Sequence, residues 1–164
     1  KREYVSLIGY MPDEFYAQGE MSVEELLCFY ADIRAVSKER TEEVITIMGL
    51  SDKRKELVKN LSKGMRQRLL AGQAILGEPR LLIMDEPTNG LDPYWINEFI
   101  DMIKKLKETG TITVFSTHMM DVAAEIADYV LFIEKGNLTK TLENDFSNID
   151  GFTKKLLMLY RQTF

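Results

Sequence analysis

The feature that most constrains the fold is the alternation of strand-like and helix-like patterns after Leu61. The apolar run Leu81–Met84 follows a proline and has the length of a buried strand. Residues 111 to 116 are rich in β-branched side chains, which favour a second strand. Apolar residues at helical spacing lie between the two. Strands that alternate with helices in this way pair in parallel through crossover connections, so the sequence predicts an α/β fold with a parallel sheet.

The region before this alternation has a helical pattern. Ser22 followed by Glu25 forms a capping box at the start of one helix, and a second helix is expected to end near Gly49. These helices fill the stretch from Met21 to Asn60. A further helix is predicted from Ser62 to Leu76.

Local signals also mark the elements near the C-terminal end. Asp92 can cap the helix between the two predicted strands, and Gly110 can end it. A short helix is expected near residues 121 to 127. Residues 129 to 134 and 138 to 141 are predicted to form two strands that turn at Gly136-Asn137.

The charge balance and the rarity of cysteine and histidine exclude several classes of protein. The chain has 21 basic and 26 acidic residues, a net charge of −5, which disfavours nucleic-acid binding. Cys28 cannot form a disulfide within the chain, and His118 alone cannot build a histidine-rich metal site. The apolar runs are far shorter than the roughly 20 residues of a membrane-spanning helix. We therefore expect a protein of a reducing compartment that does not cross a membrane by itself.

Polar residues follow both predicted parallel strands. Asp85 and Glu86 come after the first strand, and Ser116, Thr117 and His118 come after the second. Ligands bind beyond the carboxyl ends of parallel strands, so these residues form one candidate site. Asp85 could hold a hydrated Mg²⁺, Glu86 could position or deprotonate a water, and His118 could donate to phosphate oxygens. The alternatives are solvated strand-end acids and a structural histidine.

A second candidate site is the start of the helix after Leu61. Ser62 can cap this helix, and Gly64 allows close backbone approach, so its N-terminal amides could receive an anion. Seven basic residues lie in and around this segment, although a solvated amphipathic face explains most of them equally well. They are Lys53, Arg54, Lys55, Lys59, Lys63, Arg66 and Arg68.

Five segments, taken in chain order, resemble the successive motifs of an ABC transporter ATP-binding subunit of the export type. They are Ile8-Gly9-Tyr10-Met11-Pro12-Asp13, Leu61-Ser62-Lys63-Gly64-Met65-Arg66-Gln67-Arg68, Leu81 to Pro87, Asn89-Gly90-Leu91-Asp92 and Ser116-Thr117-His118. The resemblance covers nearly the whole chain except about the last 20 residues. It implies an α/β P-loop NTPase core with a helical subdomain, and ATP and Mg²⁺ as cofactors.

The resemblance also implies roles for single residues. Asp85 would act on Mg²⁺ through water, Glu86 would be the catalytic base, and His118 would contact the γ-phosphate. Ser62 and Gly64 would contact the nucleotide of a second ATPase subunit, because two subunits of this family sandwich two nucleotides head to tail.

Three further positions carry an implied role in nucleotide binding. Asp92 would line the seam between the two subunits. Lys63 and Met65 replace the first glycine and the glutamine of the usual signature, and Lys63 would add attraction for phosphate. Asp13 stands where the family has a glutamine and could bind Mg²⁺ or water.

The phosphate-cradling loop, G-x-x-x-x-G-K-[ST], is absent, since Gly-Lys occurs nowhere in the sequence. The chain also begins with lysine. We therefore expect an N-terminally truncated fragment that neither binds MgATP tightly nor hydrolyses it at a useful rate. A missing central strand would leave an open edge and an apolar face, which predicts self-association.

The expected organisation has four parts: residues 1–20 as the Q-loop region, 21–60 as the helical subdomain, 61–143 as the α/β core and 144–164 as a C-terminal helical segment. The resemblance implies a cytoplasmic protein, peripheral at the inner face of the membrane, whose helical subdomain docks on a transmembrane permease subunit. The second ATPase subunit could be identical or different. Two alternatives stay open: a non-catalytic regulatory or dimerisation module of this type, and an ABC-type ATPase that acts on ribosomes.

Overall fold

The computed structural model describes residues 6–13 and 20–163, and it divides the chain into two compact units, Lys1–Ser116 and Thr117–Phe164. Each unit is described by itself. In the described part of the chain, no helix is both long and apolar enough to span a membrane.

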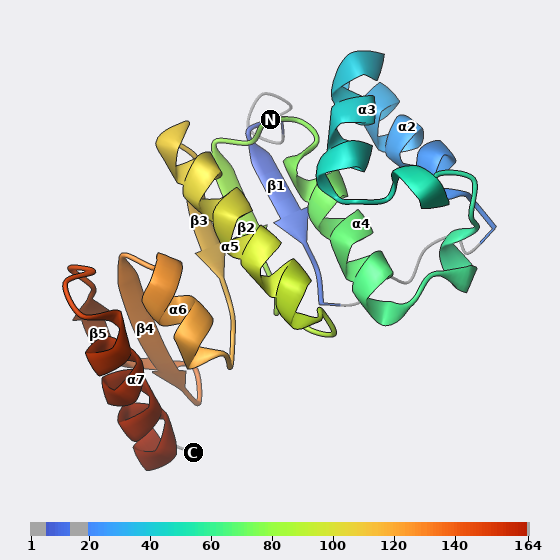
Figure 1. The fold of residues 1–164 in the computed structure, drawn as a ribbon. Helices are drawn as coiled ribbons and strands as arrows, with labels where there is room; N and C mark the ends of the chain where they lie inside the picture. Colours follow the sequence, from blue (N-terminus) through green and yellow to red (C-terminus); the bar gives the residue numbers. More distant parts are fainter. Residues whose placement is uncertain (1–5, 14–19, 164) are drawn as a thin grey trace. The chain divides into compact units, whose positions relative to one another are not determined.

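The first unit is built on a three-stranded parallel sheet in the order β1-β2-β3 (Figure 1). The strands are β1 (Ile8–Met11), β2 (Leu81–Met84) and β3 (Ile112–Phe115). The two strands predicted from the sequence are confirmed, as is the parallel α/β fold. Met11, Met84 and Phe115 stand in register, so all three strands end at the same edge of the sheet.

Two helices cover one face of this sheet, α4 (Lys63–Ile75) and α5 (Pro93–Glu108). A Cβ on Gly9 of β1 would lie 2.3 Å from the Ala74 carbonyl of α4, which shows how closely this helix approaches the sheet. On the same face, Phe99 of α5 packs edge-on against Phe115 of β3, with ring centroids 6.3 Å apart. Asp92 and Pro93 begin α5 as predicted, and Gly110 follows its C-terminal cap.

A helical region precedes α4 and packs against it. It contains α2 (Val23–Arg34), α3 (Lys38–Ile47) and two 3₁₀ turns, Ser51–Lys53 and Val58–Asn60. The predicted capping box is present. The Ser22 hydroxyl accepts from the Glu25 amide, and the Glu25 carboxylate accepts from the Ser22 amide at 2.8 Å. The apolar sides of α2 and α3 are buried.

The second unit packs two helices on a hairpin. It contains α6 (Met120–Ile126), the antiparallel strands β4 (Tyr129–Glu134) and β5 (Asn137–Glu143), and α7 (Ile149–Thr163). Phe132 of β4 and Leu156 of α7 lie in its core. The expected turn at Gly136-Asn137 is wrong by one residue. The turn lies at Lys135-Gly136, where both residues have positive φ, and Asn137 already pairs with Glu134.

Candidate functional site

The carboxyl ends of β2 and β3 bring an acid and a hydroxyl together. Because Met84 and Phe115 are in register, Asp85 and Ser116 leave their strands side by side. The Ser116 hydroxyl donates to Asp85 Oδ1 at 2.6 Å, and the Glu86 amide donates to the same hydroxyl oxygen at 2.9 Å. Both side chains are exposed. The rim therefore presents one oriented carboxylate to solvent.

Glu86 has a strained backbone that its neighbours hold in place. Its φ is +43°, in the left-handed region that costs a non-glycine residue about 1–3 kcal/mol. Its carbonyl accepts from the buried Gln67 side chain at 2.9 Å and from the Asn89 amide at 3.0 Å. With the Glu86 amide bound to Ser116, both backbone polar groups are fixed. Strain held this firmly is typical of functional sites.

The start of α4 lies against the loop that follows Glu86. Ser62 caps the helix, since its hydroxyl accepts from the Met65 amide at 3.2 Å. A Cβ on Gly64 would lie 2.8 Å from the Gly90 carbonyl, so a larger residue would separate the two segments. Ser62 and Lys63 are exposed. The helix thus presents its N-terminal end to solvent, as anion binding requires.

Asn89 links two of the predicted site residues. Its side-chain oxygen accepts from Lys63 Nζ at 2.9 Å, and its side-chain nitrogen donates to Asp13 Oδ1 at 3.1 Å. The segment after β1 and the start of α4 therefore meet at one amide side chain. Sequence reasoning did not single out Asn89 as a site residue, because its partners lie 26 and 76 positions away.

The remaining predicted residues lie elsewhere. Asp92 caps α5, and its Oδ1 accepts from the Trp95 amide at 3.0 Å. His118 belongs to the second unit, where it is exposed and lies two residues before α6. The structure thus joins Asp85 to Ser116, and Lys63 to Asp13 through Asn89.

The donor set at the rim suits a sparsely ligated magnesium ion. Within residues 6–13 and 20–163, no cluster of three or more His, Cys, Asp or Glu side chains could cage a metal. Mg²⁺ at nucleotide sites keeps several waters and uses one or two carboxylates plus phosphate oxygens. Asp85, exposed at a strand end and oriented by Ser116, fits that requirement.

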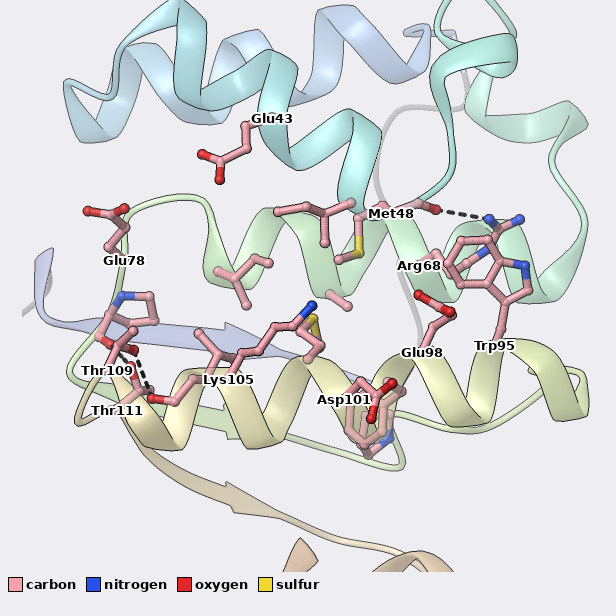
Figure 2. Close-up of a pocket in the computed structure, with 18 of the residues that line it drawn as sticks. Glu43, Met48, Arg68, Glu78, Trp95, Glu98, Asp101, Lys105, Thr109 and Thr111 are labelled. Carbon is pink, nitrogen blue, oxygen red and sulfur yellow. Dashed lines mark hydrogen bonds between the residues drawn. The ribbon is translucent and has the colours of Figure 1, made fainter.

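A cavity of about 880 Å³ lies between α5 and the pair α3 and α4 (Figure 2). Its charged side chains balance. Four are basic (Arg40, Arg68, Arg80 and Lys105), and four are acidic (Glu43, Glu78, Glu98 and Asp101). Arg40 is already paired with Glu43 at 2.8 Å. The cavity therefore lacks the uniform charge that would select an anionic or a cationic ligand.

Arg68 and Trp95 line this cavity and lie against each other in Figure 2. The guanidinium carbon lies 3.9 Å from the centre of the indole ring. Arg68 Nη1 also donates to the Met48 carbonyl at 2.9 Å, at the C-terminal end of α3. Burial lowers the pKa of Arg68, and the charge of Asp92 acts in the opposite direction. This contact joins α3, α4 and α5.

Comparison with known proteins places this geometry in a family context. The family model described as ABC transporter matches residues 1–89. The chain is 40% identical over 119 residues to the uncharacterized ABC transporter ATP-binding protein YhcH of Bacillus subtilis, covering 72% of the chain and 39% of that protein. It is 38% identical over 149 residues to the bacitracin transport ATP-binding protein BcrA of Bacillus licheniformis, covering 88% of the chain and 48% of that protein.

A solved structure shows the same fold. An ATP-binding subunit of an ABC transporter superposes with a TM-score of 0.80 at 24% identity, covering 94% of this chain and 70% of that one. The chain spans less than half the length of YhcH and BcrA.

Proposed function

The chain belongs to the ABC transporter family, and on that premise we propose that it contributes the hydrolytic rim of an ATP-binding subunit that powers transport across a membrane. The observation that carries this proposal is the junction at the ends of β2 and β3, where one hydroxyl holds Asp85 and the backbone of Glu86 together. Asp85 is exposed there, at the carboxyl end of a parallel strand, which is where ligands bind in sheets of this kind.

Each rim residue has a distinct task in this proposal. Asp85 is the residue that would hold Mg²⁺, and Ser116 fixes the orientation of that carboxylate. Glu86 accepts a hydrogen bond from the attacking water and orients it, as a general base does. Bound Mg²⁺ supplies charge neutralisation for the phosphate oxygens. For His118 the proposal keeps the role that the family motif implies, a hydrogen bond to the γ-phosphate as charge develops there.

The start of α4 serves a second ATPase subunit. Ser62, Lys63 and Gly64 present helix amides and an ammonium group to solvent, which suits a phosphate that is bound elsewhere. Asp13, which accepts from Asn89, and Asp92, which caps α5, take part in nucleotide binding in this proposal. Association of two subunits then depends on nucleotide, because the anion site is complete only when both are present.

The helical region of α2 and α3 is the proposed docking site for a transmembrane permease subunit. The proposal follows the family pattern and places the protein at the cytoplasmic side of the membrane. Transport is what the names of YhcH and BcrA describe for those relatives.

A titration of MgATP by calorimetry tests the nucleotide part of the proposal. Residues 1–164 contain no Gly-Lys pair for a phosphate loop, so we expect no saturable binding at micromolar nucleotide. A version extended at its N-terminus to include such a loop is expected to bind. Tight binding by residues 1–164 alone would mean that the nucleotide contacts are built differently and that the assigned roles are wrong.

The extended version also tests Glu86 as the catalytic base. Glu86→Gln keeps the size of the side chain and removes its charge, so we expect ATP binding to persist while hydrolysis falls about 10²–10⁴-fold. Glu108→Gln is the matched control, because Glu108 is an exposed carboxylate at the end of α5. Turnover in Glu86→Gln equal to that of the control would show that Glu86 is not the catalytic base, and absence of turnover in the unchanged extended version would favour a non-catalytic module over an enzyme.

A further inference from the structure

Glu86 holds a backbone conformation that its own sequence opposes. Its φ of +43° lies in the left-handed region, which is disfavoured for a residue that carries a Cβ. Pro87 follows it, and a proline pushes the residue before it toward an extended backbone. A residue in such a conformation stays there only when contacts from other segments hold it. The contacts that hold Glu86 therefore decide where its carboxylate is placed.

Gln67 makes one of these contacts from a different element. It lies in α4, 19 positions before Glu86, and its Nε2 donates to the Glu86 carbonyl oxygen at 2.9 Å. The Asn89 amide donates to the same oxygen at 3.0 Å, but that bond closes a turn within the loop itself. On the other side of the residue, the Glu86 amide donates to the Ser116 hydroxyl. Gln67 thus ties the Glu86 carbonyl to a helix.

The burial of Gln67 shows that this bond belongs to the packed interior. Gln67 is 3% exposed, although glutamine is mostly found at protein surfaces. A buried amide without a partner is costly, so Gln67 suits this position only with an acceptor such as the Glu86 carbonyl. One turn earlier on α4, a Cβ on Gly64 would lie 2.8 Å from the Gly90 carbonyl. The helix therefore contacts the loop after β2 at Glu86 and again at Gly90, which fixes the loop against α4.

We propose that Gln67 is a positioning residue for Glu86, whose left-handed backbone it holds so that the carboxylate reaches the attacking water. The inference rests on the proposed function, in which Glu86 is the general base. A general base must lie within hydrogen-bond reach of the proton that it takes, and a displacement of about 1 Å can cost about a hundredfold in rate. Gln67 touches neither the nucleotide nor the water in this role and acts only through Glu86.

Turnover by the version extended at its N-terminus tests the inference. Gln67→Met keeps an unbranched side chain of similar length and removes the donor, so we expect kcat to fall about tenfold to a hundredfold. KM should change less than about twofold, because the lost contact does not bind the substrate. Gln73→Met is the matched control, since Gln73 is another buried glutamine of α4, 9% exposed, and it should leave both constants unchanged.

A double variant separates a positioning role from a general structural one. If Gln67 acts through Glu86, Gln67→Met should have little further effect on the turnover that remains in Glu86→Gln, because residues that act as a unit are not additive. A full additional loss of turnover in the double variant would overturn the inference. Normal turnover in Gln67→Met, beside slow turnover in Glu86→Gln, would also overturn it and leave the proposed function standing. Normal turnover in Glu86→Gln would instead refute the general-base role, and the inference with it.

Nuclear magnetic resonance of residues 1–164 gives a readout that needs no nucleotide. In Gln67→Met, the carbonyl carbon resonance of Glu86 should shift because the oxygen loses a hydrogen bond, and the Cα and Cβ resonances should move away from left-handed values. Gln73→Met should leave these resonances in place. Gln67→Asn covers the case in which Gln67→Met does not fold, because it keeps the amide on a side chain too short to reach the carbonyl. Unchanged Glu86 resonances in either folded Gln67 variant would overturn the inference.

Discussion

Gly49 allows a test of how the helical region is attached to the sheet. It follows the C-terminal cap of α3 with φ +59°, and a Cβ added there would lie 2.2 Å from Cη2 of Trp95. Arg68 lies over the same indole and also binds the carbonyl end of α3. Gly49→Ala therefore both strains the backbone and displaces the indole ring from Arg68.

The magnitude follows from these two effects. A left-handed backbone costs a non-glycine residue about 1–2 kcal/mol. Loss of the contact between Arg68 and Trp95 adds about 0.5–2 kcal/mol. Gly49→Ala should lower the free energy of unfolding by about 1.5–4 kcal/mol. Gly110→Ala isolates the backbone effect, because Gly110 also follows a helix cap with positive φ, +86°, but a Cβ added there would meet no described atom within 4 Å.

Urea unfolding followed by tryptophan emission measures both variants. Trp95 is the only tryptophan, so the signal reports on this junction alone. We expect Gly49→Ala to shift the emission of the folded protein and to lower its stability more than Gly110→Ala does. Equal losses of stability in Gly49→Ala and Gly110→Ala, with the folded-state emission unchanged in both, would refute the idea that Trp95 fills the space that a side chain on Gly49 would need.

Two further predictions concern single polar side chains. Asn144 is buried and donates to two carbonyls at the end of α6, at 2.7 and 3.1 Å. Asn144→Ala should therefore lower the free energy of unfolding by about 2–3 kcal/mol, measured by thermal unfolding, against less than about 0.5 kcal/mol for Asn60→Ala at an exposed position. Equal losses of stability in the two variants would contradict this. Hydrogen bonds from Ser22 lower the pKa of Glu25 below its ordinary value. The ionised carboxylate therefore stabilises the fold fully at pH values above the ordinary pKa, and this stabilisation is lost as the pH falls through the lowered pKa. The difference in Tm between the wild type and Glu25→Gln should therefore narrow on acidification, and a gap that stays constant from pH 7 to pH 3 would argue against the capping role.

Periodicity and capping signals predicted most of the fold because they act over a few residues. The strand Leu81–Met84, the cap at Asp92 and the capping box at Ser22 are all local patterns, and the structure contains each of them. Strand β1 was recognisable only as part of a motif, since four residues that include a glycine give a weak signal. The hairpin turn was misplaced because Lys135 adopts a left-handed conformation that its residue type rarely favours.

The candidate site was predictable only in outline. Position directly after an apolar strand predicted that Asp85 and Ser116 share an edge of the sheet. Their hydrogen bond depends on the register between β2 and β3, which the sequence alone does not specify. The link between Lys63 and Asp13 through Asn89 depends on three segments that meet only in the folded chain. Long-range contacts of this kind leave no periodic signal.

The hydrogen bond from Gln67 to the Glu86 carbonyl makes the start of α4 and the proposed catalytic base one mechanical unit. Gln67 lies one helical turn beyond Gly64, and a rotation of α4 about its axis would carry its amide away from the sheet. Breaking that hydrogen bond would leave the buried Gln67 amide without a partner, at a cost of about 1–3 kcal/mol. If the hydrogen bond is kept, the rotation of α4 must instead change the left-handed backbone conformation of Glu86. A ligand that binds at Ser62 and rotates α4 would therefore also shift the backbone of Glu86 at the hydrolytic rim.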